Sequence, residues 1–276
     1  MHCLKGGMHN LPKAFFNNEI LIKDDIEYKK QVYEINYWYQ EKYPQKDVVE
    51  VSCYSINDAP SVFKGKAVII TTPINILRQI KFKSKLDDIK SQLAMKKSVQ
   101  AMGNVFNQHS TKIFLQTKER FWENEGIKGG FSKTNLPIGQ IHYVTPEDSK
   151  TREGLLMIYT LTKEALLYGS MKEEVVKQKV VKQLEEIHPN FKEDMVTTFI
   201  VHDWNNLPSY QGAYGAVKTS HYESTRHLWE PMGNVHFAGE RISFTRMWIQ
   251  GALESGLKAA FQVYERHMER TWNHTL

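Results

Sequence analysis

Hydrophobic positions change their spacing several times along the chain, and each spacing predicts a different element. Val176, Val180 and Leu184 recur every fourth position with charges between them, so residues 173–187 are predicted to form an amphipathic helix. Short apolar or alternating runs predict strands, and the polar segment 43–47 predicts a turn. Strands are predicted within 19–54 and at 67–71, 112–115, 140–144, 154–161, 195–204 and 235–240, and further helices at 11–16, 86–99 and 248–270. The mixture predicts an α/β or α+β chain, with two interwoven domains.

Composition and charge narrow the class of protein. A hydrophobic fraction of 41% in 276 residues is sufficient for a sizeable core. The net charge of +5 is small and scattered, and no basic block interleaves with aromatic residues, so a nucleic-acid partner is not expected. No apolar stretch reaches the roughly 18 residues of a membrane span. We expect no membrane association.

Cysteine and histidine usage bears on compartment and metal binding. Cys3 and Cys53 do not form a metal-spaced cluster or a disulfide framework, so we expect a reducing, cytoplasmic compartment. The first residues contain no apolar signal region. His221 and His227 are the nearest approach to a histidine pair, and they lack carboxylates at metal spacing. We interpret them as surface residues and expect no metal site.

The strongest local pattern is a short buried strand and acidic turn, at 235–240, followed by a helix rich in small residues. Gly251, Ser255 and Ala259 lie four residues apart, and Ala252, Gly256 and Ala260 form a second row beside them. Each glycine inside a helix costs about 1 kcal/mol relative to alanine. Two of them indicate close approach of a sheet or a ligand, and a tightly packed helix without a ligand is the alternative.

These residues resemble a known family. Val235 to Glu240, followed by Trp-Ile-x-Gly-Ala-Leu-Glu-Ser-Gly from Trp248, resembles the C-terminal FAD-binding signature of flavin-containing amine oxidases. The resemblance extends over nearly the whole chain, and the run from Lys112 to Gly130 is most like L-amino-acid oxidases. Further segments that carry it are Gly7–Ala14, 67–73, Phe121–Gly130, Trp204 and Gly212–Tyr214.

The resemblance implies a fold and a reaction. It implies a partial FAD/NAD(P)-binding-type flavin domain, from residues 1–85 and 229–276, interwoven with a mixed-sheet substrate-binding domain from residues 105–205. In this family an amine with an α-hydrogen gives a hydride to FAD. The imine then hydrolyses, and oxygen reoxidises the flavin to yield hydrogen peroxide. An L-amino acid or another primary amine is the implied substrate.

The resemblance also implies roles for single residues on the substrate side. Lys112 matches the lysine that holds a water near the flavin, and a solvated lysine is the alternative. Tyr159 matches the tyrosine that binds the substrate carboxylate, and a core tyrosine is the alternative. Trp204 and Trp248 match aromatic walls of the flavin and substrate, which exclude water. Met247 stands next to Trp248 where the family usually has glycine, so we expect it to narrow the substrate cavity.

Cofactor-binding positions follow in the same way. Gly239 and Glu240 match the turn at the sugar-alcohol and phosphate part of FAD. Trp248 and Ile249 match the start of the helix behind that turn, where they meet the flavin. Val32 matches a strand position whose backbone meets the adenine, a contact that requires no particular side chain.

One departure from the family is large. The chain contains no Gly-x-Gly-x-x-Gly, the motif whose helix N-terminus holds the pyrophosphate of FAD. The arginine that pairs with the substrate carboxylate would also lie in the part that this chain lacks. We therefore expect the isolated chain to bind FAD weakly or not at all, and to require a separate N-terminal FAD-binding chain or a longer gene product.

Three functions remain open at this point. The first is a partial amine oxidase of the L-amino-acid oxidase type, which self-associates into a homodimer. The second is a catalytically inactive remnant or interaction module of the same fold. The third is a polyamine oxidase-like enzyme, against which Tyr159 and the run Phe121–Glu123 argue mildly.

Overall fold

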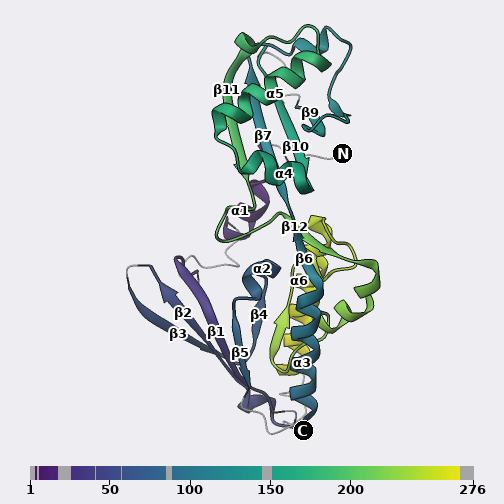
Figure 1. Ribbon diagram of the computed structural model, residues 1–276. Helices are drawn as coiled ribbons and strands as arrows, with labels where there is room; N and C mark the ends of the chain where they lie inside the picture. Colours follow the sequence, from purple (N-terminus) through teal and green to yellow (C-terminus); the bar gives the residue numbers. More distant parts are fainter. Residues whose placement is uncertain are drawn as a thin grey trace.

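The computed structural model describes residues 4, 6–17, 26–40, 42–56, 58–84, 89–144 and 151–267. Its buried apolar side chains form two clusters. One cluster draws on residues 35–105 and 228–242, and the other on residues 113–191. Figure 1 shows the corresponding two parts of the molecule, one above the other, with strands β6 and β12 near their junction and helix α3 along the lower part.

The first part contains a four-stranded sheet of order β3-β2-β1-β5. Strands β1, β2 and β3 run antiparallel, and β5 pairs parallel with β1. Ile35 and Tyr37 alternate with less buried residues in β1 and point into the core, as expected for a sheet with one covered face. The bounds are α1 Asn10–Asn17, β1 Lys30–Trp38, β2 Val48–Ser55, β3 Asp58–Gly65 and β5 Lys81–Ser84.

Beside this sheet lies a parallel pair of short strands, β4 (Val68–Ile70) and β13 (Val235–Phe237). All three residues of β13 are buried, as the continuous apolar run predicts. Helix α6 (Ile249–His267) packs against β13. Helices α2 (Ile74–Leu77) and α3 (Ile89–Asn104) complete this part.

The second part is an antiparallel five-stranded sheet of order β11-β7-β10-β9-β8. Helix α5 buries Val176, Val180 and Leu184 against one face of this sheet, together with Tyr168 of α4. The other face carries no helix of the described chain. The bounds are β7 Ser110–Thr117, β8 Gly130–Lys133, β9 Gln140–Val144, β10 Gly154–Leu161, α4 Thr162–Gly169, α5 Glu173–Ile187 and β11 Val196–Asp203.

A short antiparallel pair joins the two parts, with β6 (Val105–Gln108) directly after α3 and β12 (Tyr214–Val217) after the second sheet. In the described part of the chain, short segments of 3₁₀ helix connect other elements. They are η2 Pro44–Lys46, η3 Phe121–Glu123, η4 Glu193–Met195, η5 Thr219–His221, η6 Glu223–Leu228 and η7 Glu240–Ile242.

The mixed α/β class predicted from the sequence is confirmed. The helix at 173–187 and the strand at 154–161 have the predicted bounds. The sequence analysis did not predict β3, β5, β6, β8, β12, α2 or α4. The parts of the predicted elements at 19–25, 86–88 and 268–270 lie outside the described residues. No helix in the described part of the chain is long and apolar enough to cross a membrane.

Candidate functional site

The uncovered face of the five-stranded sheet carries a row of polar side chains. His202, Lys112, Tyr159 and Gln140 lie directly opposite one another on β11, β7, β10 and β9. Residues paired across neighbouring strands point to the same face of a sheet. Lys112 and Tyr159 alternate with Ile113 and Ile158, which are fully buried on the face covered by α4 and α5. The row therefore lies on the opposite, open face.

Lys112 and Tyr159, the two residues predicted for catalysis and substrate binding, are neighbours in this row. The Nζ atom of Lys112 lies 5.3 Å from the centroid of the Tyr159 ring. At that distance the ring face attracts the ammonium group. Both side chains are half-buried, so the ammonium group and the hydroxyl can contact a polar ligand while the rest of each side chain packs against apolar neighbours.

His142 lies on the same face, one row away, and the sequence analysis did not select it. Its ring stacks on Phe131 at 5.3 Å between centroids and meets Tyr159 edge-on at 6.4 Å. Burial, and then the charge of Lys112, lower the pKa of His142. The sequence signal for this position is the alternation along β9, in which Ile141 and Tyr143 are buried and Gln140, His142 and Val144 point to the other face.

The turn after β13 is held by its own side chains and by α6. Gly239 has φ = 121°, a conformation that favours glycine. Its N–H donates to the hydroxyl of Ser255 at 2.9 Å. The carboxylate of Glu240 accepts the N–H of Gly215 at 2.7 Å and the N–H of Met247 at 2.9 Å. Glu240 therefore ties β12 and the start of α6 to one turn.

Arg241 is a buried cation at the carboxyl ends of β4 and β13. Its guanidinium donates to the backbone oxygens of Thr71 at 3.1 Å and Ile70 at 3.2 Å. Its Nε has no hydrogen-bond partner in the described chain. Burial lowers the pKa of Arg241 to about 10, and the charge of Glu240 opposes that shift. A Cβ at Gly215 would lie 2.6 Å from the Cβ of Arg241, which explains the glycine there.

Tyr214 lies close to both Tyr159 and Glu240, so it interacts electrostatically with the open face of the sheet and with the turn after β13. Burial raises the pKa of its hydroxyl, and the neighbouring Tyr159 and Glu240 raise it further. Tyr159 belongs to the open face of the second sheet, and Glu240 belongs to the turn at α6. The sequence analysis placed Tyr214 in a matching segment without assigning it a role.

Large apolar side chains at the start of α6 are exposed. Phe244, Met247, Trp248 and Ile249 are each more than half exposed. Met247 has φ = 69°, a left-handed conformation at the position where the family usually has glycine. The exposed apolar surface, the charged turn beside it and the orphaned Nε of Arg241 fit the ring end of FAD. The described residues supply no glycine-rich loop for its phosphates.

Two of the predicted cofactor residues lie elsewhere. Trp204 follows β11. Its backbone N–H donates to the backbone oxygen of Ser110 at 3.3 Å, and the centroid of its ring lies 4.5 Å from that of the His202 ring, which it meets edge-on. It therefore borders the open face near Lys112. Val32 lies at a bulge of β1 in the four-stranded sheet and packs against the first hydrophobic cluster.

The row of small residues along α6 packs against protein. Gly251, Ser255 and Ala259 are buried, and a Cβ at Gly251 would collide with the backbone oxygen of Thr245. At Gly251 the close approach that the glycine indicates is therefore made by the protein backbone. In the second row, a Cβ at Gly256 would meet nothing within 4 Å.

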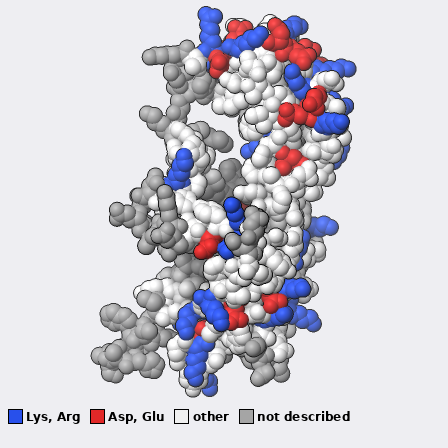
Figure 2. All heavy atoms as spheres, turned by 90° about the vertical axis from the view of Figure 1, so that its left-hand side faces the viewer, with Lys and Arg blue, Asp and Glu red and all other residues white. Residues whose placement is uncertain are grey.

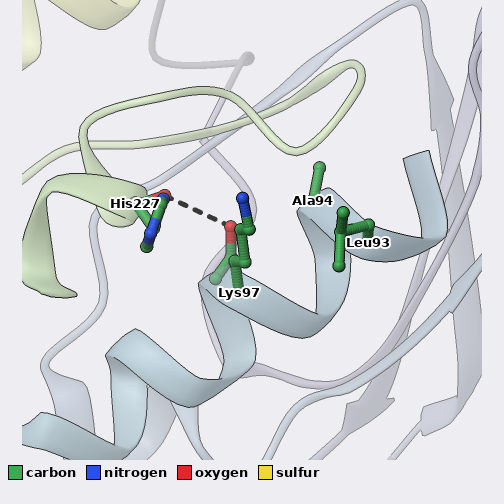
Figure 3. Close-up of a pocket in the computed structure, with 5 residues that line it drawn as sticks. Leu93, Ala94, Lys97 and His227 are labelled. Atoms are coloured by element: carbon green, nitrogen blue, oxygen red, sulfur yellow. Dashed lines mark hydrogen bonds between the residues drawn. The ribbon is translucent and has the colours of Figure 1, made fainter. Parts of the chain in front are cut away.

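One of the cavities lined by described residues includes a predicted site residue. A cavity of about 240 Å³ lies between α3 and η6, where the Ser98 hydroxyl donates to His227 O at 3.2 Å (Figure 3). A second cavity, of about 300 Å³, includes Tyr159, Gln140 and Glu164 in its lining. Within the described ranges, no group of three His, Cys, Asp or Glu residues could hold a metal ion.

The site thus combines an antiparallel sheet, backed by helices on one face, with a strand–turn–helix unit that exposes large apolar side chains. The family model for flavin-containing amine oxidoreductases matches residues 1–264. The chain belongs to this family, whose cofactor is FAD.

Individual relatives agree with this membership. The chain is 32% identical over 180 residues to an L-amino-acid oxidase of Siganus canaliculatus, covering 64% of this chain and 34% of that protein. It is 30% identical to an L-amino-acid oxidase of Crotalus adamanteus, covering 94% and 48%. It is 28% identical to YobN of Bacillus subtilis, covering 94% and 52%. The chain thus spans about half the length, or less, of these relatives.

Solved structures show the same fold. Putrescine oxidase bound to putrescine matches 94% of this chain and 53% of its own, with a TM-score of 0.74 at 16% identity. Cyclohexylamine oxidase of Brevibacterium oxydans matches 85% and 48%, with a TM-score of 0.64 at 17% identity.

Proposed function

We propose that this chain is the C-terminal part of an FAD-dependent oxidase that deaminates an L-amino acid or another primary amine. The complete enzyme would release an imine or keto acid, ammonia and hydrogen peroxide. The observation that carries the proposal is the pairing of Lys112 with Tyr159 on the open face of the second sheet. Both residues alternate with buried neighbours along their strands, so their side chains lie on the face of the sheet that no described helix covers.

The residues of this chain would divide the work. Bound FAD would accept the hydride, and this chain would bind and orient the substrate. Lys112 would hold a water by its ammonium group, and Tyr159 would donate its hydroxyl proton in a hydrogen bond to a substrate carboxylate. Trp204, Met247, Trp248 and Ile249 would exclude water from the reacting carbon. Gly239 and Glu240 would meet the sugar-alcohol chain of the cofactor, and Val32 the adenine.

The chain is proposed to act only with a dinucleotide-binding segment. It contains no Gly-x-Gly-x-x-Gly, so the N–H groups that neutralise the pyrophosphate must come from elsewhere. A separate N-terminal FAD-binding chain, or the same segment in a longer product, would supply them. A homodimer of the completed enzyme is part of the proposal.

The test is an assay of peroxide release. The chain is assayed with FAD and a panel of L-amino acids and amines, alone and with the part of YobN that the alignment leaves uncovered. Peroxide only in the mixture supports the proposal. A stoichiometric flavin spectrum of the isolated chain would refute the need for a second segment, and no peroxide in either case favours the inactive alternative.

Two variants separate amino-acid from amine oxidation. Tyr159→Phe removes the hydroxyl and is expected to raise KM for an L-amino acid, while KM for the amine that lacks the carboxylate stays the same. Lys112→Met is expected to lower kcat for both substrates. Equal KM changes for both substrates with Tyr159→Phe would favour a polyamine oxidase-like enzyme.

A further inference from the structure

The charged side chains on the open face of the five-stranded sheet have one sign near Tyr159. Lys133 of β8 lies opposite Gln140 and therefore extends the row of polar side chains to the edge strand. The next row along the strands consists of Ile200, Phe114, Met157, His142 and Phe131. Among the described residues of these two rows there are two lysines, Lys112 and Lys133, and no carboxylate.

Neither lysine is neutralised by an acid. The ammonium group of Lys112 lies over the Tyr159 ring, and Lys133 is exposed. In the part of the chain that the structure describes, neither ammonium group forms a salt bridge. A lysine ammonium is a positive charge with three hydrogen-bond donors and no acceptor. The face therefore offers two free cationic donors to a ligand at Tyr159.

Carboxylates farther from the row are already partnered. Glu153, six residues before Tyr159 along β10 and so roughly 20 Å away, accepts a hydrogen bond from Gln116 at 2.8 Å. Glu240, on the other side of Tyr214, uses its two oxygens for the N–H groups of Gly215 and Met247. These acids leave the two lysines uncompensated.

The cavity of about 300 Å³ lies at the end of the polar row. Its lining includes Lys133, Gln140 and Tyr159, together with Thr134 and Asn135 of the segment between β8 and β9. These side chains supply several hydrogen-bond donors around one opening. The cavity can therefore bind a polar group next to the Tyr159 hydroxyl.

The opposite wall of this cavity contains a strained residue and an acid. Thr162 has φ = 56°, an outlier for a β-branched residue, and such residues cluster at ligand sites. Glu164 is the acid of the lining. Its carboxylate pairs with Lys163 at 3.5 Å and accepts the Thr162 hydroxyl at 3.4 Å. The acid of the cavity thus has a counter-ion, whereas Lys133 has none among the described residues.

From this distribution of charge we infer that the site takes an acidic L-amino acid. Its side-chain carboxylate binds Lys133 in the cavity, while its α-carboxylate binds the hydroxyl of Tyr159. Lys133 is then a specificity-determining residue. The inference rests on the proposed function, because it names the substrate class of the same site.

The spacing of the strands agrees with such a substrate. Tyr159 and Lys133 lie two strands apart, so their backbones are separated by roughly 10 Å. A hydrogen bond between an ammonium or hydroxyl group and a carboxylate is about 2.8 Å long. One such bond at each end leaves the length of a short dicarboxylate between the two side chains. Gln140, on the strand between them, can donate to the same ligand.

Three other substrate classes fit less well. A diamine would place a second ammonium group near Lys112 or Lys133, where like charges repel. A basic amino acid would have to displace Lys163 from Glu164 and approach Lys133. An apolar amino acid could lie along Phe131 and Met157, but it would leave Lys133 without a partner. Each class is an arm of the test.

The first test measures binding to the whole chain without FAD, so that no probe is oxidised. Glutarate carries two carboxylates, pentanoate has a methyl group in place of one of them, and putrescine is a diamine. Backbone amide shifts of residues 133–140 and 159 in NMR titrations give the dissociation constants. Glutarate is expected to bind at least about tenfold more tightly than pentanoate, because it adds a charge-assisted hydrogen bond. Putrescine is expected to cause no shift at these residues.

Variants assign the added affinity to one side chain. Lys133→Met is expected to reduce the affinity for glutarate to that for pentanoate, and Lys133→Arg, which keeps the charge, is expected to retain it. Tyr159→Phe should weaken both probes alike, because each has the first carboxylate. Lys182→Met, at an exposed lysine of α5 on the covered side of the sheet, is the matched control and should bind as the unaltered chain does.

The second test uses the peroxide assay of the completed enzyme with L-glutamate and its neutral isostere L-glutamine. The unaltered chain is expected to favour L-glutamate by at least about tenfold in kcat/KM, and Lys133→Met should abolish that preference through KM. Equal use of both amino acids, or a preference for L-leucine, L-lysine or putrescine, would overturn the inference and leave the oxidase activity standing.

The binding test can also fail alone. Pentanoate or putrescine bound as tightly as glutarate, or full glutarate binding by Lys133→Met, would overturn the inference whatever the peroxide assay gives. Glutarate binding that depends on Lys133, without peroxide from any amine, would support the acidic subsite and contradict the proposed activity.

Discussion

The carboxylate of Glu240 accepts the backbone N–H of Gly215 at 2.7 Å, which joins the turn after β13 to strand β12. Its second oxygen accepts the N–H of Met247 at 2.9 Å, just before α6. One side chain thus connects strand β12, the turn after β13 and the start of helix α6. On the face that Figure 2 shows, charged side chains are most numerous toward the two ends of the molecule, and acidic and basic side chains also lie between them.

We predict that Glu240→Ala lowers the free energy of unfolding by about 1–3 kcal/mol, because two N–H groups lose their acceptor. Glu240→Gln keeps one acceptor oxygen and should cost less. Urea denaturation followed by tryptophan fluorescence measures both. Glu265→Ala, on the exposed part of α6, is the control. Equal stability of the Ala variant and the unaltered protein would show that water satisfies these groups as well as Glu240 does.

Met247→Gly is expected to stabilise the fold by roughly 0.5–1 kcal/mol. Met247 has φ = 69°, and a left-handed conformation costs a side chain with a Cβ about 1–2 kcal/mol. Part of this gain is offset because glycine is more flexible in the unfolded chain. Met247→Ala retains the Cβ and should show no gain. A Gly variant less stable than the Ala variant, in matched urea titrations, would contradict strain at this position.

The two glycines of α6 should respond to alanine in opposite directions. Gly251→Ala is expected to destabilise the protein by about 1–3 kcal/mol, because its Cβ collides with the Thr245 carbonyl and backbone must move. Gly256→Ala is expected to stabilise it by up to about 1 kcal/mol, because its Cβ meets open space and alanine favours the helix. Thermal unfolding of the pair tests this, and changes of the same sign would refute the packing described here.

Lys258 predicts a pH dependence of stability. Burial lowers the pKa of Lys258 to about 8, whereas an unfolded lysine titrates near about 10.4. Between these values the unfolded chain binds more protons, so stability rises with pH in that window, and below pH 8 the destabilisation by the charged form is fully present. Lys258→Met should remove this rise.

The measurement is the free energy of unfolding in urea from pH 7 to 10.5, compared between Lys258→Met and the unaltered chain. Lys163→Met, at a lysine whose side chain is 88% exposed, is the control and should leave the pH profile unchanged. A constant difference between Lys258→Met and the unaltered chain across this range would mean that Lys258 titrates alike in both states.

The sequence alone was sufficient for elements whose burial follows one clear period. Residues 173–187 and 154–161 have their predicted bounds because each buries side chains at one regular period, every fourth residue in the helix and every second residue in the strand. The short strands β5 and β8 could not be predicted, because each has only four residues and no buried side chain. They are strands because a neighbouring strand supplies their hydrogen-bond partners.

The candidate site divides in the same way. The motif around Gly239 and the positions of Lys112 and Tyr159 could be recognised in the sequence, and the division at 1–85, 105–205 and 229–276 stays a prediction. Only the tertiary structure decided that Tyr214 and His142 adjoin these residues and that Arg241 turns toward β4, because these contacts join segments that are far apart in the chain. It also decided which side of α6 faces outward, since the contacts of Lys258, Gln262 and Arg266 fix the rotation of that helix.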